Sequence, residues 1–259
     1  MLAASETSMG ITELSTNLRI NKSSVHRLIK SLGATGYVIQ DKDRSYRASF
    51  KLWKLGISVM SHTNLAKVSA RAMNALARST GESVHLSVLN GLRTLYIEKI
   101  DSAQPVRAYI PRGGEAPLHC VATGKILLAF NYGSLRDAMI GGLTRYTPKT
   151  ITSMAALDAE MARIRASGIA INSGEYRTDV VALAAAVRDP RDQVIAAVGI
   201  SGPLSRMPRP RVKQLTPIVI EAGEAISAEL NQIAGRKATE PALPWETKAR
   251  EAMRAGLKQ

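Results

Sequence analysis

The sequence predicts an α+β protein of two domains, and two observations carry that prediction. First, residues 1–49 show the order helix, short turn, helix and strand pair, with turn residues between the periodic segments. Second, the remaining residues alternate helices with apolar runs that are joined by tight-turn signals such as Asn90-Gly91. Because strands joined by tight turns pair antiparallel, we expect hairpins with helices on their faces rather than a doubly wound parallel sheet.

Residues 21–32, NKSSVHRLIKSL, predict an amphipathic helix. Its apolar residues recur at i, i+3, i+4 and i+7 and form one face: Val25, Leu28, Ile29 and Leu32. Asn21 is a suitable N-cap, and Gly33 and Gly36 are expected to end the helix. The preceding helix is expected to be capped by Thr12 and to bury Leu14 and Leu18.

A strand pair follows, with YVIQ at residues 37–40 and SYR at residues 45–47 on either side of the charged turn DKDR. Helix, turn, helix and hairpin in this order indicate a winged helix-turn-helix. In that motif the second helix enters the major groove of DNA and the hairpin, or wing, lies along the phosphate backbone.

The polar face of the second helix has two interpretations, an ordinary solvated surface or a DNA contact. Arg and hydroxyl side chains suit base edges and phosphates, and Lys suits phosphates. Lys22 stands at the helix N-terminus, where backbone N–H groups also favour a phosphate. We favour the DNA contact and predict these DNA-binding residues: Thr12, Lys22, Ser23, Ser24, His26, Arg27, Lys30, Lys42, Arg44 and Tyr46.

Residues 50–60, FKLWKLGISVM, predict a connecting helix that is apolar over most of its circumference. Such a helix needs partners on more than one side. Packing against a second protomer would supply them, and packing within the chain would do so too. We favour the dimer.

The second domain is expected to contain helices at residues 65–78, 121–130, 154–168 and 216–233, and strands at residues 83–89, 93–100, 106–110, 169–172, 180–189 and 193–201. Residues 111–117, PRGGEAP, are expected to form a loop. The predicted organisation is a winged helix-turn-helix at residues 1–49, a linker helix at 50–62, an α/β domain at 63–235 and a polar tail at 236–259.

Composition agrees with a basic, globular protein. The chain has 259 residues, is 45% hydrophobic, and carries 35 Lys and Arg against 21 Asp and Glu, a formal net charge of +14. A basic chain attracts polyanions, nucleic acid first. Residues 1–60 hold nine basic and four acidic side chains, and the rest of the excess is spread along the chain, which makes it weaker evidence than a patch. No apolar run reaches the roughly 20 residues of a membrane span, and MLAASETSMG is not a signal peptide, so we expect a cytoplasmic protein.

Four segments resemble the IclR family of bacterial transcription regulators: ITELSTNLRINKSSVHRLIKSLGATGYVIQ, SYRASFKLWKLG, PLHCVATGKILLAF and AAAVRDPRDQVIAAVGISGPLSRM. The resemblance implies a GAF-like effector-binding domain after the helix-turn-helix and linker helix. It also implies a dimer or tetramer that binds double-stranded operator DNA. A small organic acid or aromatic compound in the C-terminal pocket would modulate that binding.

The expected pocket begins in RGGEAPLHCVATGK, because backbone N–H groups at a helix N-terminus can hold a carboxylate. This segment contributes Gly113, Gly114, His119, Cys120 and Thr123. Taken singly, His119 is more often a structural group, and Cys120 is more often a small buried hydrophobe. By resemblance, the cavity is also lined by Asn172, Ala182, Gly199 and Ser201.

Two departures from the family pattern matter. MLAASETS corresponds only to the end of the usual first helix. Loss of the rest of that helix would expose the apolar faces of the next two helices. Either the start codon is placed too far downstream or the DNA-binding domain is compromised. In the second case, the alternative function is a small-molecule-binding dimer that no longer binds operators. The family often has a polar or thiol-bearing residue near Ala182, whereas residues 180–187 are all apolar here, which indicates a less polar ligand.

Motifs of common enzymes are missing from the sequence. The four histidines form no HExxH, and no GxGxxG or GxSxG occurs in the required context. Residues 123–125, TGK, do not complete a phosphate-binding loop, since His119 replaces the required Gly and Ile126 the required Ser or Thr. A GAF-fold sulfoxide reductase would need a resolving thiol besides Cys120, the single cysteine. We therefore expect neither an enzyme nor a metal or other cofactor.

Overall fold

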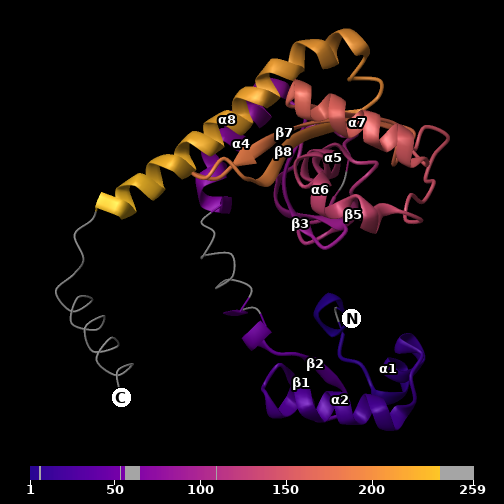
Figure 1. Cartoon of the computed structure of the whole chain (residues 1–259). Coiled ribbons are helices and arrows are strands. Elements are labelled where there is room, and N and C mark those ends of the chain that lie inside the picture. The colour runs from indigo at the N-terminus through magenta and orange to yellow at the C-terminus, as the bar shows by residue number, and fades with distance from the viewer. Residues whose placement is uncertain (6, 53, 56–64, 109, 240–259) are drawn as a thin grey trace, which may run out of the picture. The chain divides into compact units, whose positions relative to one another are not determined.

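The computed structural model describes residues 1–5, 7–52, 54–55, 65–108 and 110–239 (Figure 1). It divides into two compact units, Met1–Leu65 and Ala66–Gln259. The fold is α+β in the second unit and a winged helix-turn-helix in the first, so the predicted fold class is confirmed.

The first unit contains the 3₁₀ turn η1 (Leu2–Ala4), helices α1 (Ile11–Leu18) and α2 (Lys22–Ala34), and strands β1 (Val38–Gln40) and β2 (Tyr46–Ala48). β1 and β2 pair antiparallel. The predicted cap of α2 is confirmed, because Asn21 Oδ1 accepts the Ser24 N–H at 2.8 Å. Gly36, just beyond the helix end, has a φ of +75°, which glycine adopts without a steric penalty.

The predicted cap of α1 is wrong. The helix begins at Ile11, one residue before Thr12, and Gly10 is its N-cap without a side-chain hydrogen bond. Thr12 therefore lies inside the first turn, where its carbonyl oxygen accepts the Thr16 hydroxyl. A preceding glycine can take the extended N-cap conformation without a side-chain acceptor, and the choice of Thr12 overlooked that.

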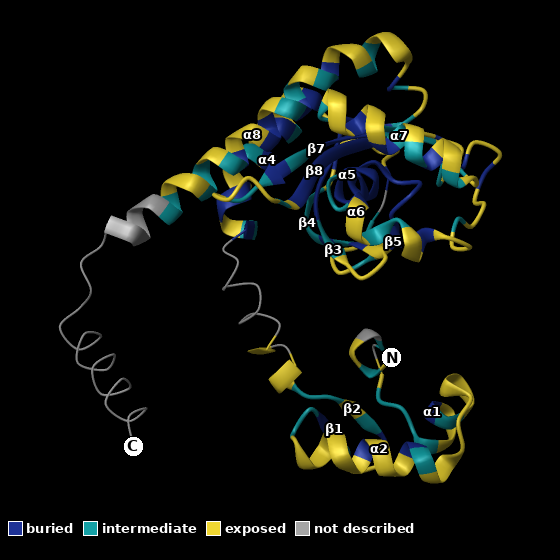
Figure 2. Cartoon of the chain, in the orientation of Figure 1, coloured by how far each residue is buried: buried dark blue, intermediate teal, exposed yellow. Residues whose placement is uncertain are grey.

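The core of the first unit is small and lies between α1, α2 and β1. Its buried members are Leu14, Val25, Ile29 and Val38. Leu18 was expected in this core, but it is 45% exposed, and Leu28 and Leu32 of the predicted apolar face are 53% and 41% exposed. Figure 2 shows exposed positions along α2. These leucines line an apolar groove, which also includes Leu52 and Leu55.

Only part of the predicted connecting helix can be compared with the structure. Residues 50–52, 54 and 55 are helical, and Phe50 is 80% exposed. Residue 53 and residues 56–60 of that prediction lie outside the described residues. The predicted dimer packing along this helix stays a prediction.

The second unit is built on one antiparallel sheet in the order β5-β4-β3-β8-β7-β6. The strands are β3 (Ser83–Asn90), β4 (Arg93–Ile100), β5 (Glu115–Pro117), β6 (Ile169–Ser173), β7 (Val180–Arg188) and β8 (Val194–Pro203). The two long predicted hairpins are β3–β4 and β7–β8, and β8 pairs with β3 to join them into one sheet.

Helices cover both faces of this sheet. They are α4 (Leu65–Thr80), α5 (Ala122–Phe130), α6 (Tyr132–Leu135), α7 (Met154–Ser167) and α8 (Arg209–Thr239), with a 3₁₀ turn η2 (Asp137–Met139). α5 and α7 share an apolar cluster with Ala184 and Ala197 of the strands. α8 packs on the other face, where a Cβ on Gly223 would lie 2.6 Å from the Ala186 carbonyl oxygen. Successive residues of a strand face opposite sides, so small residues along β7 admit a helix on each.

The predicted strand at residues 106–110 is wrong for its described residues, which are irregular. The Val106 carbonyl oxygen instead accepts a hydrogen bond from Arg206. The strand that pairs with β4 on the side away from β3 lies within the predicted loop, as β5. Gly113 makes this possible, because its φ of +78° turns the chain back and its N–H donates to the Tyr96 carbonyl oxygen at 2.7 Å.

α8 also differs from its prediction, since it begins at Arg209 rather than Thr216 and continues to Thr239 rather than Ile233. Pro217 lies inside the helix, where it removes one N–H donor and normally kinks or breaks the backbone. Proline is common at the first position of a helix, so the pair Thr216-Pro217 resembles a helix start although α8 begins earlier. Residues 236–239 of the predicted tail belong to α8, and the remainder of that tail lies outside the described residues.

Among the described residues, no helix combines the length and apolar character needed to cross a membrane.

Candidate functional site

The exposed face of α2 carries four polar side chains that are predicted to face DNA. All four are exposed, and they lie opposite the buried Val25 and Ile29: Ser23, His26, Arg27 and Lys30. The Ser23 hydroxyl donates to Asn21 Oδ1 at 2.8 Å, so its oxygen remains an acceptor at the helix start. A hydroxyl, an imidazole, a guanidinium and an ammonium on one helix face can bind base edges and phosphates.

The β1–β2 hairpin places two exposed cations at its tip, Lys42 and Arg44. Arg44 has a φ of +67°, a conformation that few residues other than glycine adopt. The neighbouring acids are engaged within the hairpin. Asp41 pairs with Arg47 at 2.9 Å, and hydrogen bonds from the Ser45 side chain and backbone lower the pKa of Asp43. These contacts keep both carboxylates bound to the hairpin itself.

The remaining predicted DNA-binding residues occupy different surroundings. Lys22 is exposed at the first position of α2, and Ser24 beside it is half-buried. Tyr46 is half-buried, pairs with Met9 through its main chain, and packs on the core of the unit. Thr12 is exposed on α1.

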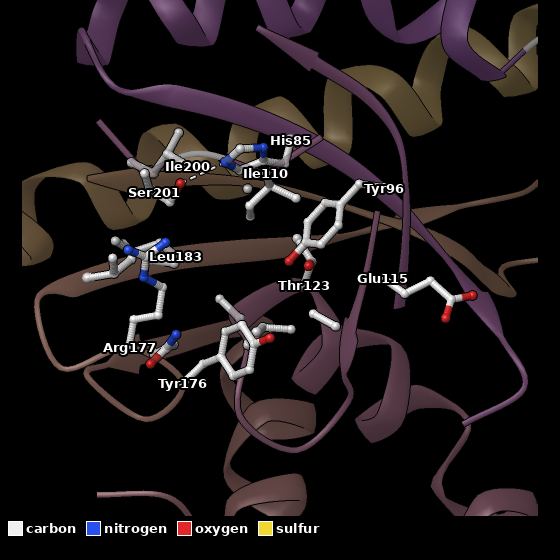
Figure 3. A pocket seen from close by; sticks show the side chains of 18 of the residues that line it. His85, Tyr96, Ile110, Glu115, Thr123, Tyr176, Arg177, Leu183, Ile200 and Ser201 are labelled. Atoms are coloured by element: carbon white, nitrogen blue, oxygen red, sulfur yellow. Dashed lines mark hydrogen bonds between the residues drawn. The ribbon is translucent and has the colours of Figure 1, made fainter. Parts of the chain in front are cut away.

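The second unit contains a cavity of about 420 Å³ beside α5 and the sheet (Figure 3). Five predicted residues line it: Thr123, Asn172, Ala182, Gly199 and Ser201. The lining does not include the other four, Gly113, Gly114, His119 and Cys120.

These four residues form a turn or are buried within the protein instead. Gly113 and Gly114 form the turn into β5, and a Cβ on Gly114 would lie 2.9 Å from Pro111. His119 is buried, with Nε2 bonded to the Thr144 carbonyl oxygen at 3.0 Å, and burial lowers its pKa. Cys120 is fully buried, and burial raises the pKa of its thiol to about 12. The prediction placed them in the pocket because they lie near α5 in sequence, but their neighbours Glu115, Ala116 and Val121 line the cavity instead.

At one side of the cavity, His85 of β3 meets Ser201 of β8. His85 Nε2 and Ser201 Oγ are 2.6 Å apart, as the dashed line in Figure 3 shows. Burial lowers the pKa of His85 to about 4, so the imidazole is neutral near pH 7. Its Nδ1 is buried and has no hydrogen-bond partner among the described residues.

At the start of α5, three residues line the cavity: Val121, Ala122 and Thr123. α5 has no side-chain cap at its N-terminus, so its first N–H groups remain available as donors. Thr123 Oγ1 is buried without a well-aligned hydrogen bond, and the Tyr96 hydroxyl is its neighbour. Burial raises the pKa of Tyr96 to about 12, which keeps that hydroxyl protonated.

The loop between β6 and β7 brings Tyr176 and Arg177 to the cavity (Figure 3). The Tyr176 ring packs edge-on against Tyr146, with ring centroids 4.9 Å apart. Arg177 is exposed and therefore lies at the mouth rather than in the interior. Asn172 Oδ1 accepts the Glu175 N–H at 2.8 Å, which ties this loop to β6.

Sequence reasoning missed several of these lining residues. His85 had one usable signal, an ionisable residue within an otherwise apolar strand. Tyr176 and Arg177 lie in a loop whose path no local pattern predicts. The apolar wall predicted at β7 is present, formed by Val180, Ala182 and Leu183, but other elements supply polar groups.

Sequence models of two related domains match the chain. The IclR helix-turn-helix domain matches residues 1–42, and the bacterial transcriptional regulator IclR C-terminal domain matches residues 57–228. The chain belongs to the IclR family. Its members are transcriptional regulators rather than enzymes, which agrees with the expectation that this protein is not an enzyme.

Curated relatives in the IclR family include the transcriptional regulators XynR and KdgR of Escherichia coli K12. XynR is 32% identical over 86% of this chain and 90% of its own length, and KdgR is 32% identical over 87% of each. A crystal structure of a putative IclR regulator from Silicibacter sp. TM1040 is 28% identical. It matches with a TM-score of 0.77 and covers 86% of this chain and 89% of that one. An IclR homologue from Microbacterium hydrocarbonoxydans, crystallised with 4-hydroxybenzoate, shares the fold at 23% identity, with a TM-score of 0.75 over 89% of this chain and 95% of that one.

Proposed function

We propose that this IclR-family regulator binds operator DNA through α2 and the β1–β2 hairpin, and that a small organic acid with an apolar or aromatic body controls that binding. The observation that carries the proposal is the cavity of the second unit. Its apolar walls surround an uncapped helix N-terminus and buried hydroxyl groups. Pockets of this kind bind small molecules and orient them with a few polar contacts.

The DNA contact rests on the four side chains on the exposed face of α2. Arg27 is exposed near the middle of α2 and would bond base edges, and Ser23 is exposed near the helix start, the end that would enter the groove. Lys30, Lys42 and Arg44 would neutralise phosphates. Operator DNA usually has two half-sites, so a homodimer would present one such helix to each, and a tetramer would carry two such pairs. A regulator of this type acts in the cytoplasm, where the chromosome lies.

The ligand contact rests on complementary chemistry within the cavity. A carboxylate would be held by the N–H groups at the start of α5 and by the Thr123 hydroxyl, because a helix N-terminus favours negative charge. Tyr96, Tyr176 and Leu183 would pack against its apolar body. Arg177 at the mouth would attract the anion, and the Ser201–His85 pair would bond a second polar group.

The mechanism would be a shift between two populations of the protein. A ligand that binds one arrangement of the paired DNA-binding units more tightly than another shifts the equilibrium towards the first. The affinity for two half-sites then changes with ligand concentration.

Fluorescence-anisotropy titration of DNA from upstream of the protein's own gene, against scrambled DNA, tests the first half of the proposal. We expect the upstream DNA to bind more tightly than the scrambled DNA. The logarithm of the association constant should fall with the logarithm of the salt concentration, with a slope of about 0.9 per phosphate contact. Binding with no preference for the upstream DNA would contradict the proposed operator contact.

Calorimetric titration with benzoate and 4-hydroxybenzoate tests the second half, with benzyl alcohol as the uncharged control. We expect the carboxylates to bind and the alcohol to bind more weakly. Equal binding of benzoate and benzyl alcohol would contradict the carboxylate site at α5. Ligand binding without operator binding would instead favour the alternative of a ligand-binding protein.

A further inference from the structure

Lys125 is a buried cation next to the cavity but outside its lining. It lies on α5, two residues beyond the lining residue Thr123, and its side chain is 1% exposed. Its ammonium group makes three hydrogen bonds, to Glu160 Oε1 at 2.9 Å, to the Ile171 carbonyl oxygen at 2.6 Å and to Glu175 Oε1 at 2.7 Å. An ammonium has three donors, so all of them are used.

The two carboxylates around Lys125 differ in their other partners. Glu160 also pairs with Arg163, at 2.7 and 2.9 Å. Hydrogen bonds from Arg163 and the charge of Lys125 outweigh burial and lower the pKa of Glu160 to about 2. Lys125 is the one ion-pair partner of Glu175 among the described residues, although the backbone of Ser173 also hydrogen-bonds its carboxylate, and Glu175 Oε2 is buried without a hydrogen bond. Burial raises the pKa of Glu175 against the opposing charge of Lys125.

Glu175 belongs to the loop of residues 174–179, which supplies Tyr176 and Arg177 to the cavity. Hydrogen bonds hold the loop on both sides of Glu175. Its N–H donates to Asn172 Oδ1, and its carbonyl oxygen accepts the Thr150 hydroxyl at 2.6 Å. These two bonds orient the backbone so that the Glu175 side chain reaches Lys125, and the next two residues line the cavity (Figure 3).

We propose that Lys125 is a positioning residue for the ligand pocket: its ion pair with Glu175 holds the 174–179 loop so that Tyr176 and Arg177 form the cavity wall. The physical reason is the cost of an unpaired buried charge. Glu175 is only 14% exposed, so without Lys125 its carboxylate becomes fully hydrated if the loop moves away from α5. Moving the loop displaces the two pocket residues. The expected effect of Lys125 on ligand binding rests on the proposed function, whereas its expected effect on the loop does not.

Hydrogen–deuterium exchange of the full-length protein tests the role of the ion pair without any ligand. Lys125→Met removes the ammonium and keeps a long unbranched side chain. We expect exchange in a peptide covering residues 173–180 to become about tenfold faster, because local opening exposes its amides. Peptides from the β7–β8 ladder serve as the internal reference and should change far less.

Two double variants separate positioning from general damage to the core. Lys125→Met with Glu175→Gln neutralises the stranded carboxylate and should return loop exchange to within about threefold of wild type, because a neutral amide is cheaper to bury than a charge. Lys125→Met with Glu160→Gln is the matched control and should leave exchange fast, because in Lys125→Met the Glu160 carboxylate still pairs with Arg163 and its removal relieves no unpaired charge. Unchanged exchange in Lys125→Met, or equal behaviour of the two double variants, would overturn the proposal. If Lys125→Met alone does not fold, the proposal predicts that adding Glu175→Gln restores folding and that adding Glu160→Gln does not. Recovery with both second substitutions, or with neither, would overturn the proposal.

Benzoate calorimetry on the same variants gives the functional consequence. Lys125→Met should weaken binding about tenfold, a change of about 1.4 kcal/mol, and Glu175→Gln should restore most of it. A wild-type protein that binds no benzoate would count against the proposed ligand, whereas the exchange experiment would still decide the role of Lys125. Wild-type binding that Lys125→Met leaves unchanged would contradict the inference alone.

Discussion

The exposed face of α2 and the cavity of the second unit are built in opposite ways. The α2 surface comes from thirteen consecutive residues, and its side chains point away from a small core. The cavity is assembled from strands β3 to β8, the start of α5 and the loop at residues 174–179, so that His85 bonds a partner 116 positions away. The first surface depends on helical periodicity, and the second depends on how distant segments pair.

This difference has consequences for how each region responds to substitution. An exposed side chain on α2 has few partners within the protein, so its removal should change binding and leave stability almost unchanged. A cavity residue bonds to neighbours that are themselves buried, so its removal affects both ligand binding and the fold. The following predictions test that contrast, beginning with the largest expected effect.

His85→Gln should remove a pH dependence of stability from the second unit. The folded protein holds the pKa of His85 at about 4 by burial, whereas the ordinary value is 6.5. Between these pH values the unfolded chain binds a proton that the folded protein does not. The stabilising contribution is therefore complete above pH 6.5 and declines as the pH falls to 4, by about 3 kcal/mol.

Chemical unfolding at pH 7 and pH 4.5 measures this contribution as the difference between wild type and His85→Gln. His26→Gln, from the exposed face of α2, is the matched control and should follow the wild-type curve. A wild-type protein whose stability falls no more steeply than that of His85→Gln would refute the buried neutral imidazole.

Arg27→Ala should weaken operator binding about 30-fold, or about 2 kcal/mol, if the guanidinium bonds a base edge. Its unfolding midpoint should match that of wild type, because Arg27 is exposed and outside the core of the first unit. Anisotropy titration and urea unfolding give the two values. Arg78→Ala removes an exposed guanidinium from α4 and should bind DNA as wild type does, and equal losses in both variants would remove Arg27 from the interface.

Asn172→Leu should weaken benzoate binding about tenfold, because it removes a polar contact in the cavity and the bond to the Glu175 N–H. Ligand-free DNA binding should stay intact. Asn74→Ala, on an exposed part of α4, is the control. Calorimetry would rule Asn172 out of the site if the variant bound benzoate with wild-type affinity.

Lys42→Ala is expected to have the smallest effect. Losing one phosphate contact should reduce affinity about threefold at moderate salt and make the salt slope shallower by about 0.9. Lys67→Ala, on α4, provides a variant of equal charge. Identical salt slopes for wild type and Lys42→Ala would place the hairpin tip away from DNA.

Local patterns predicted much of the fold but less of the site. The hairpins β3–β4 and β7–β8 follow from alternating apolar runs joined by turn residues, and the cap of α2 follows from Asn21. The prediction failed at residues 106–110, where the residues suit a strand but β5 pairs with β4 instead. Strand propensity describes how well a residue suits a sheet and does not determine which strand it pairs with.

The sequence by itself determined the fold class, the family and the polar face of α2, because these depend on residue types at fixed short spacings. Only the tertiary structure decided which polar groups surround the cavity. It excluded His119 and Cys120, which lie next to α5 in the chain, and admitted His85 and Arg177, which lie far from it. It also turned Lys125 from part of an incomplete phosphate-binding motif into the partner of Glu175. The energetic effect of a buried charge depends on the group beside it in space, and sequence spacing does not specify that group.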